Sequence, residues 1–157
     1  MRYSVIILFI LLYASSSVAA PYKGAGSKVE AFGKIMGTYS LALSFTEICS
    51  EDPAYKNESE QTAKKYLDNN QALINELNKK INQLAVENGG NQEQLRLNSE
   101  IKRSLLQMKS QTKKTANKAI VHKDSCSAIL ENLRNGTMDI KTKRSDEVAL
   151  IMGYTAL

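Results

Sequence analysis

The chain has 157 residues, of which 43% are hydrophobic and 24% are charged, and its formal net charge is +5. This is enough apolar material for one hydrophobic core and not for two, so we expect a single folded domain. The basic excess is mild and does not indicate a nucleic acid-binding protein, while a single His and no Trp leave few groups for catalysis.

The first twenty residues have the pattern of a secretory signal peptide. Arg2 precedes an apolar run over 5–14, and mostly small residues follow over 15–20. The run is shorter than the ~20 residues that cross a bilayer, and nothing downstream is long and apolar enough, so we expect no transmembrane segment in the mature chain. We predict a signal peptide over 1–19, with cleavage after Ala19 or alternatively after Ala20, and one helical domain over 20–157.

A helix is predicted over 27–48. Its apolar residues recur at intervals of three and four, which places them on one helical face: Val29, Phe32, Ile35, Met36, Tyr39 and Leu43. Gly33 and Gly37 lie inside this segment, where each costs about 1 kcal/mol relative to Ala. Two glycines four residues apart either permit close approach of a neighbouring helix or weaken this one, and the sequence leaves both open.

The segment that follows is predicted to stop this helix and start a second one. Asp52 before Pro53 suits a helix start, since Asp is a good N-cap and Pro is favoured at the first helical position. Asn57, with Glu60 three residues later, is an alternative start of the capping-box type. From there an apolar stripe predicts an amphipathic helix of about seven to eight turns that ends at residues 88–90, where two glycines terminate it.

A third helix is predicted from Asn91 to Leu133, because its apolar stripe runs without Gly or Pro until Gly136. The stripe is polar over 112–115, where a break in the helix would be no surprise. After Gly136 a basic stretch leads to Ser145, a candidate N-cap that precedes two acidic residues, and a short C-terminal helix is predicted to begin just after it.

These elements predict an all-α fold, a small antiparallel helical bundle built on a long helical hairpin, packed by the first helix and closed by one disulfide. Cys49 and Cys126 are the only cysteines, and in an exported chain such a pair is usually a disulfide. Folding the hairpin about residues 89 and 90 places position 53 opposite Cys126, only ~6 Å along a helix from Cys49. The bond would remove unfolded-chain entropy worth about 4 kcal/mol.

A metal or thiol site at these cysteines is the alternative. His122 lies four residues before Cys126 on the same helix face, and with Cys49 it offers three ligands to zinc or a base for a cysteine nucleophile. Structural zinc takes four ligands, no fourth is indicated, and the Cys-x-x-Cys spacing of redox proteins is absent. We therefore expect no cofactor, no metal and no catalytic residue.

Two tripeptides match the acceptor pattern for N-glycosylation, at Asn57 and at Asn135. The pattern arises easily by chance in an Asn-rich chain, and it matters only in a eukaryotic secretory pathway. The bare exported helical domain favours a bacterial envelope instead, so use of either site is left open.

We therefore expect an exported, non-enzymatic helical interaction protein that binds another envelope or extracellular protein, in the bacterial periplasm or outside the cell. The absence of a phosphate-binding loop, a nucleophile elbow or paired carboxylates is the reason to expect no enzyme. A candidate partner surface is the C-terminal apolar segment, provided that it does not pack back on the bundle: Val148, Leu150, Ile151 and Tyr154. The alternative function is a periplasmic chaperone or a binder of polyanions or membrane surfaces, acting through basic helix faces that contain Lys113, Lys114 and Lys118.

Overall fold

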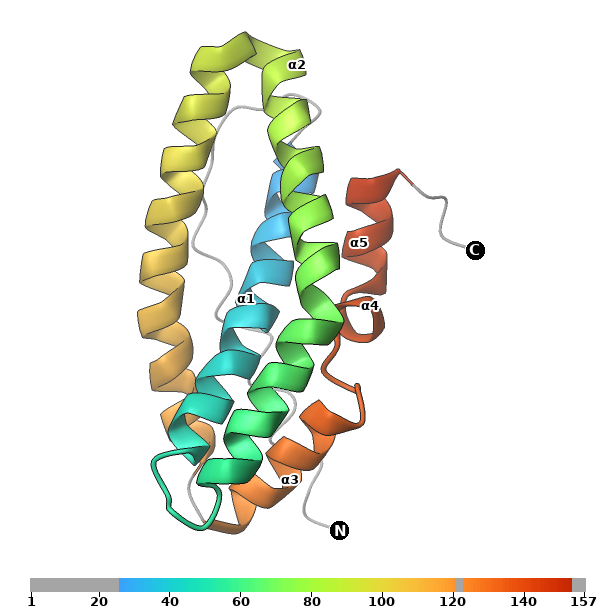
Figure 1. The fold of residues 1–157 in the computed structure, drawn as a ribbon. Helices are drawn as coiled ribbons and strands as arrows, with labels where there is room; N and C mark the ends of the chain where they lie inside the picture. The colour runs from blue at the N-terminus through green and yellow to red at the C-terminus, as the bar shows by residue number, and fades with distance from the viewer. Residues whose placement is uncertain (1–25, 121–122, 154–157) are drawn as a thin grey trace, which may run out of the picture.

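The computed structural model describes residues 26–120 and 123–153, and within these ranges the chain is helical with no strand (Figure 1). The helices are α1 (Gly26–Cys49), α2 (Lys56–Ala119), α3 (Lys123–Arg134), α4 (Ile140–Lys143) and α5 (Ser145–Met152). The predicted all-α class is confirmed, and the predicted first helix matches α1 to within one residue at each end. The predicted signal peptide over 1–19 lies outside the described residues.

The long element α2 is a helical hairpin that folds back on itself at Gly90 (Figure 1). Gly90 has φ 68° and ψ −164°, a backbone conformation that is essentially restricted to glycine. We call residues 56–89 the first arm and residues 91–119 the second arm. The turn lies where the two glycines predicted it, and a single rotation about the backbone of Gly90 sets the two arms side by side.

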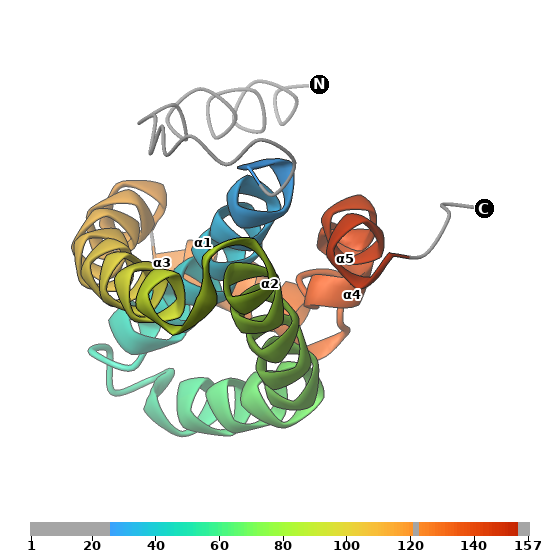
Figure 2. The same ribbon diagram turned by 90° about the horizontal axis from the view of Figure 1, so that it is seen from above.

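Helix α1 is the central element, because both arms of α2 and the C-terminal helices pack on it. Figure 2 shows α1 between the second arm and α5. One core cluster joins all of these elements. It contains Phe32 and Ile35 of α1, Leu77 of the first arm, Leu97 of the second arm and Ile151 of α5. A helix that meets neighbours on several sides buries apolar residues around most of its circumference, which accounts for the apolar sequence of α1.

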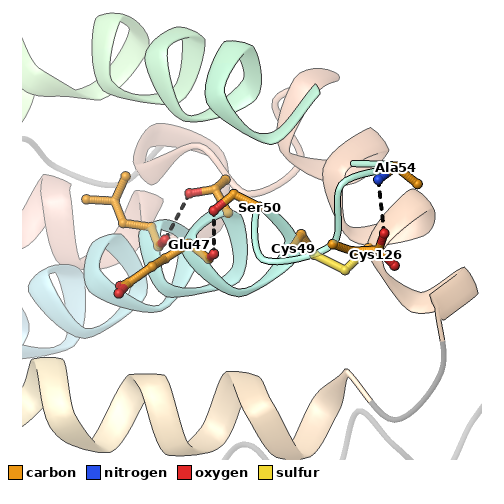
Figure 3. Close-up of a disulfide and its surroundings, with 8 residues drawn as sticks. Glu47, Cys49, Ser50, Ala54 and Cys126 are labelled. Carbon is orange, nitrogen blue, oxygen red and sulfur yellow. Dashed lines mark hydrogen bonds between the residues drawn. A yellow bond between two sulfur atoms is a disulfide. The ribbon is translucent and has the colours of Figure 1, made fainter. Parts of the chain in front are cut away.

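The disulfide closes the end of the bundle that lies opposite the hairpin turn. Cys49 at the end of α1 and Cys126 in α3 are bonded, with their Cα atoms 5.6 Å apart and 77 positions between them (Figure 3). Both residues are buried and pack with Leu130 in a small core cluster of their own. The predicted staple and its place in the fold are therefore confirmed.

The start of α2 was predicted wrongly. Neither Asp52 nor Asn57 caps the helix, which begins at Lys56 after Tyr55 with no side-chain cap hydrogen bond. The Asp52 carboxylate accepts a hydrogen bond from the Ala54 backbone N–H at 2.9 Å, and the Tyr55 N–H bonds to the Asp52 carbonyl oxygen at 3.0 Å. An Asp-Pro pair serves a β-turn as well as a helix start, and here it makes the turn.

The break in the predicted third helix was also misplaced. The helix runs straight through Thr112 and Thr115 and ends at Ala119, after which α3 begins at Lys123. Each of these threonines donates its hydroxyl to the carbonyl oxygen four residues earlier, at 2.9 and 3.0 Å, so both fit inside a helix. The short helix α4 was not predicted, and α5 begins at Ser145, the residue expected just before it.

Candidate binding surface

The excess positive charge of the chain lies entirely on the second arm of α2. Residues 91–119 contain seven basic and two acidic side chains, whereas the rest of the 157-residue chain contains fourteen of each. The net charge of +5 is therefore that of this one helix. A charge gathered in this way creates a potential on one side of the molecule, which evenly mixed charges do not.

The second arm also carries the two most exposed large hydrophobic side chains among the described residues. Leu95 is 71% exposed and Leu106 is 68% exposed. They lie eleven positions apart, which is close to three helical turns, so they point to the same side of the arm. With 3.6 residues per turn, Lys102 and Lys109 fall within ~60° of both leucines, and Arg103 lies on the adjoining side.

We call this surface the outer face and define it by six residues: Leu95, Lys102, Arg103, Leu106, Lys109 and Lys114. All six are exposed. In Figure 1 the second arm, drawn from yellow to orange, runs along the edge of the bundle, with α1 on its inner side. The outer face therefore combines apolar and basic side chains on a helix whose opposite side is held by the core.

Some basic residues of the second arm already have acidic partners. Arg96 pairs with Glu93 at 2.6 Å and with Glu100 at 2.8 Å, and Lys113 pairs with Glu47 of α1 at 2.8 Å. The hydrogen bond from Arg96 lowers the pKa of Glu93. The hydrogen bond from Lys113 likewise lowers the pKa of Glu47, and the charge of Lys109 acts in the same direction.

The remaining basic side chains are not neutralised in this way. Lys102, Arg103, Lys114 and Lys118 have no acidic group within ion-pair distance in the part of the chain that the structure describes. Two of the six residues of the outer face are thus apolar and exposed, and none of its four cations has an ion pair among the described residues. The surface carries the groups for binding an anionic partner without first breaking internal ion pairs.

The inner side of the second arm is anchored to α1 by small and hydroxylated residues. The Thr112 hydroxyl oxygen lies 3.1 Å from those of both Ser40 and Ser44. A Cβ atom added at Gly37 would lie 3.8 Å from the Met108 sulfur, so this glycine faces the second arm closely. Of the polar residues at 112–115, which suggested a break, Thr112 instead contacts hydroxyl groups of α1 and Lys113 pairs with Glu47 of α1. The anchoring gives the outer face a rigid support.

The C-terminal segment docks on the opposite side of α1 through buried polar contacts. Asn70 of the first arm is 1% exposed, accepts the Ile140 backbone N–H at 2.8 Å and donates to the Asp139 carboxylate at 3.1 Å. Arg144 donates to the Thr38 hydroxyl of α1 at 2.8 Å. These contacts place α4 and α5 against the bundle, and the first N–H of α4 is satisfied by a side chain from another helix.

The docking of α5 on the bundle buries some residues of the predicted C-terminal partner surface and leaves others exposed. Ile151 is 2% exposed and Val148 is partly buried against the core, whereas Leu150 is 44% exposed. Tyr154 lies outside the described residues. A partner for this end of the molecule stays a prediction, resting on one exposed leucine among the residues described.

Both cysteines are used in the disulfide, so neither offers a thiolate as a zinc ligand or a nucleophile. His122, the third member of that alternative site, lies outside the described residues. The described residues contain no group of three His, Cys, Asp or Glu side chains that could hold a metal ion. None of the described helices is both long and apolar enough to cross a membrane.

The two possible glycosylation sites differ in their surroundings. Asn57 lies in the first turn of α2, and Ser59 of its tripeptide is only 1% exposed. Asn135 lies in the turn after α3, where its side-chain oxygen accepts the Thr137 backbone N–H at 3.4 Å. Both asparagines are exposed, and modification of either stays an open question.

Comparisons with protein-family models, curated proteins and solved structures give no match.

Of the six residues of the outer face, only Lys114 was among the basic residues that the sequence analysis named for the alternative function, although two signals for the whole face are present in the sequence. Leu106 lies off the apolar stripe that Leu97, Ile101 and Leu105 form at intervals of four, so the sequence marks it as an apolar residue on the polar side of the helix. The other signal is the charge of residues 91–119 compared with the rest of the chain. A count over the whole chain hides it, because the remainder is balanced.

Proposed function

We propose that this protein is an exported, non-enzymatic interaction protein whose binding surface is the outer face of the second arm. The observation that carries the proposal is the pair of leucines about 70% exposed on the same side of one basic helix. Covering both would contribute roughly 2 to 4 kcal/mol from the hydrophobic effect. Single exposed leucines are ordinary on a protein surface, but their place on the most charged helix of the chain supports a common role.

The disulfide supports the exported part of the proposal, because structural disulfides persist in oxidising compartments. The N-terminal pattern, in which Arg2 precedes an apolar run and then small residues, supports it independently. The intact mass of the natural protein tests both, since it reads the N-terminus and the loss of two hydrogens on disulfide formation. A retained N-terminus with free thiols would contradict export.

The binding surface is tested by site-specific photo-crosslinking in cells. A photoreactive amino acid replaces Leu106 on the outer face or, as the matched control, Ala72, an exposed residue of the first arm. We expect one defined adduct from position 106, and we expect that adduct to be absent when the photoreactive residue is at position 72. The same adducts from both positions, or none from position 106, would refute the proposed surface.

A further inference from the structure

We infer that the outer face of the second arm docks on an anionic phospholipid bilayer. This inference rests on the proposed binding surface and names what occupies it. The surface has two components, unpaired cations and exposed leucines, and a bilayer offers the complement of each within a few ångströms: phosphate groups at its surface and acyl chains just beneath them.

The charge distribution determines which side of the molecule faces the bilayer. The second arm carries all of the net charge of +5, and the rest of the chain is balanced. Each Lys or Arg held near an anionic membrane strengthens binding roughly fivefold. Lys102, Arg103 and Lys114 are exposed and have no ion pair among the described residues, so their attraction to lipid phosphates is not offset by partners within the protein.

The two leucines distinguish a bilayer from a soluble polyanion. Nucleic acids and sulfated glycans would attract the same lysines, but their charged backbones provide no apolar layer for Leu95 and Leu106. In a bilayer these side chains enter the boundary between headgroups and acyl chains while the flanking cations stay at the phosphates. The arrangement of apolar residues between basic ones on one helix face therefore favours lipid.

The size of the surface favours a bilayer over a protein partner. The second arm has 29 residues, which corresponds to a length of ~43 Å. With a helix width of ~10 Å it presents ~430 Å², about half of the ~800 Å² that a stable protein interface buries on each partner. Binding to a membrane depends on the sum of electrostatic attraction and leucine burial and needs no such area.

The charge contribution is tested by vesicle co-sedimentation of the full chain. The vesicles consist of phosphatidylcholine with about a third phosphatidylglycerol, and phosphatidylcholine alone serves as the uncharged comparison. The test variant combines Lys102→Gln, Arg103→Gln and Lys114→Gln. All variants share the same N-terminal residues 1–25, so any contribution of that segment is common to them and cancels in the comparison.

The matched control combines Lys64→Gln, Lys79→Gln and Lys80→Gln, three exposed lysines of the first arm. It changes the net charge by the same amount on a different face. We expect the outer-face triple to weaken binding to anionic vesicles at least tenfold, since each cation counts roughly fivefold, and the control to change it less than twofold. Equal losses from both triples, or equal binding to uncharged vesicles, would overturn the inference.

The leucine contribution is tested with Leu95→Gln combined with Leu106→Gln, and Leu150→Gln is the control at the exposed leucine of α5. We expect the double variant to lose at least about thirtyfold in vesicle affinity and the control to lose little. All of these side chains are exposed, so the variants should unfold at the same temperature as the unmodified protein. A double variant that binds vesicles normally would overturn the inference and leave a polyanion as the ligand. In that case the double variant and the unmodified protein should bind duplex DNA with equal affinity.

The photo-crosslinking result separates failure of this inference from failure of the proposed surface. A lipid adduct at position 106 supports both. A protein adduct at position 106, together with vesicle binding that the outer-face variants do not weaken, refutes the bilayer and keeps the surface. The absence of any adduct at position 106 refutes the surface, and the bilayer with it.

Discussion

Replacement of Asn70 by Ala should weaken the attachment of the C-terminal segment to the bundle. The Asn70 side chain is 1% exposed, and its oxygen accepts the backbone N–H of Ile140, a residue with no exposed surface. Its amide donates to the Asp139 carboxylate at 3.1 Å and to the Tyr66 carbonyl oxygen at 2.8 Å. Asn70→Ala leaves the Ile140 N–H buried without this acceptor and takes one donor from a carboxylate.

The expected loss follows from these two bonds. A buried amide left unpaired costs about 1 to 3 kcal/mol, and a hydrogen bond to a charged group contributes about 1.5 to 3 kcal/mol. Asn69, which donates to the other Asp139 carboxylate oxygen at 3.2 Å, retains part of the second contribution. We therefore expect Asn70→Ala to lower the free energy of unfolding by about 3 kcal/mol, a large share of the total for a small domain.

Urea denaturation followed by circular dichroism measures this loss. With a denaturant dependence of about 2 kcal/mol per molar, the midpoint should fall by about 1.5 M. Asn69→Ala is the matched control, because this neighbouring residue is exposed and should cost less than about 1 kcal/mol. Limited proteolysis should also cut residues 136–153 faster in Asn70→Ala than in the control. Equal midpoints for the two variants would show that the Ile140 N–H finds another acceptor and that the reasoning is wrong.

Three further predictions concern the backbone, the staple and a buried tyrosine. Gly90→Ala should destabilise the protein by about 1 to 3 kcal/mol, because Gly90 has φ 68°. Gly33→Ala should stabilise it by up to about 1 kcal/mol, because no described atom outside its own helix turn lies within 4 Å of the added Cβ atom. Thermal unfolding distinguishes the two, and a shift in the same direction for both would contradict this account. Reduction of the disulfide, which spans 77 positions, should cost about 4 kcal/mol, and an unchanged urea midpoint with reductant would disprove its stabilising role. Burial raises the pKa of Tyr66, and the Asp139 charge adds to the effect. This contribution to stability is therefore present below pH ~10, the unfolded value, and is lost as the pH rises above it. Denaturation curves at neutral and high pH measure how much unfolding free energy is lost on going to alkaline pH. Tyr66→Phe should make this loss smaller, and an unaltered pH dependence would exclude a contribution from Tyr66.

The sequence was sufficient for features that depend on local pattern. Apolar residues at intervals of three and four marked α1 almost to its ends, because one helical turn takes 3.6 residues, although α1 buries residues around most of its circumference and not on one side alone. The two glycines before residue 91 marked the hairpin turn, because one of them takes a backbone conformation that other residues avoid. The pairing of Cys49 with Cys126 followed from their being the only two cysteines of a chain expected to be exported, and the length of the hairpin supported it by placing them at the same end of the bundle.

What only the tertiary structure decided was which neighbour each face meets. The polar stretch around Thr112 suggested a break, yet it faces the hydroxyl groups of Ser40 and Ser44 on α1 and stays helical. Asn70 was not singled out in the sequence, yet it is buried because the C-terminal segment covers it. In the C-terminal apolar segment Ile151 is buried and Leu150 is exposed, because only one side of α5 packs against the bundle. Local periodicity states which side chains share a face, whereas burial depends on the distant segment that packs against that face, and no pattern within one helix contains that information.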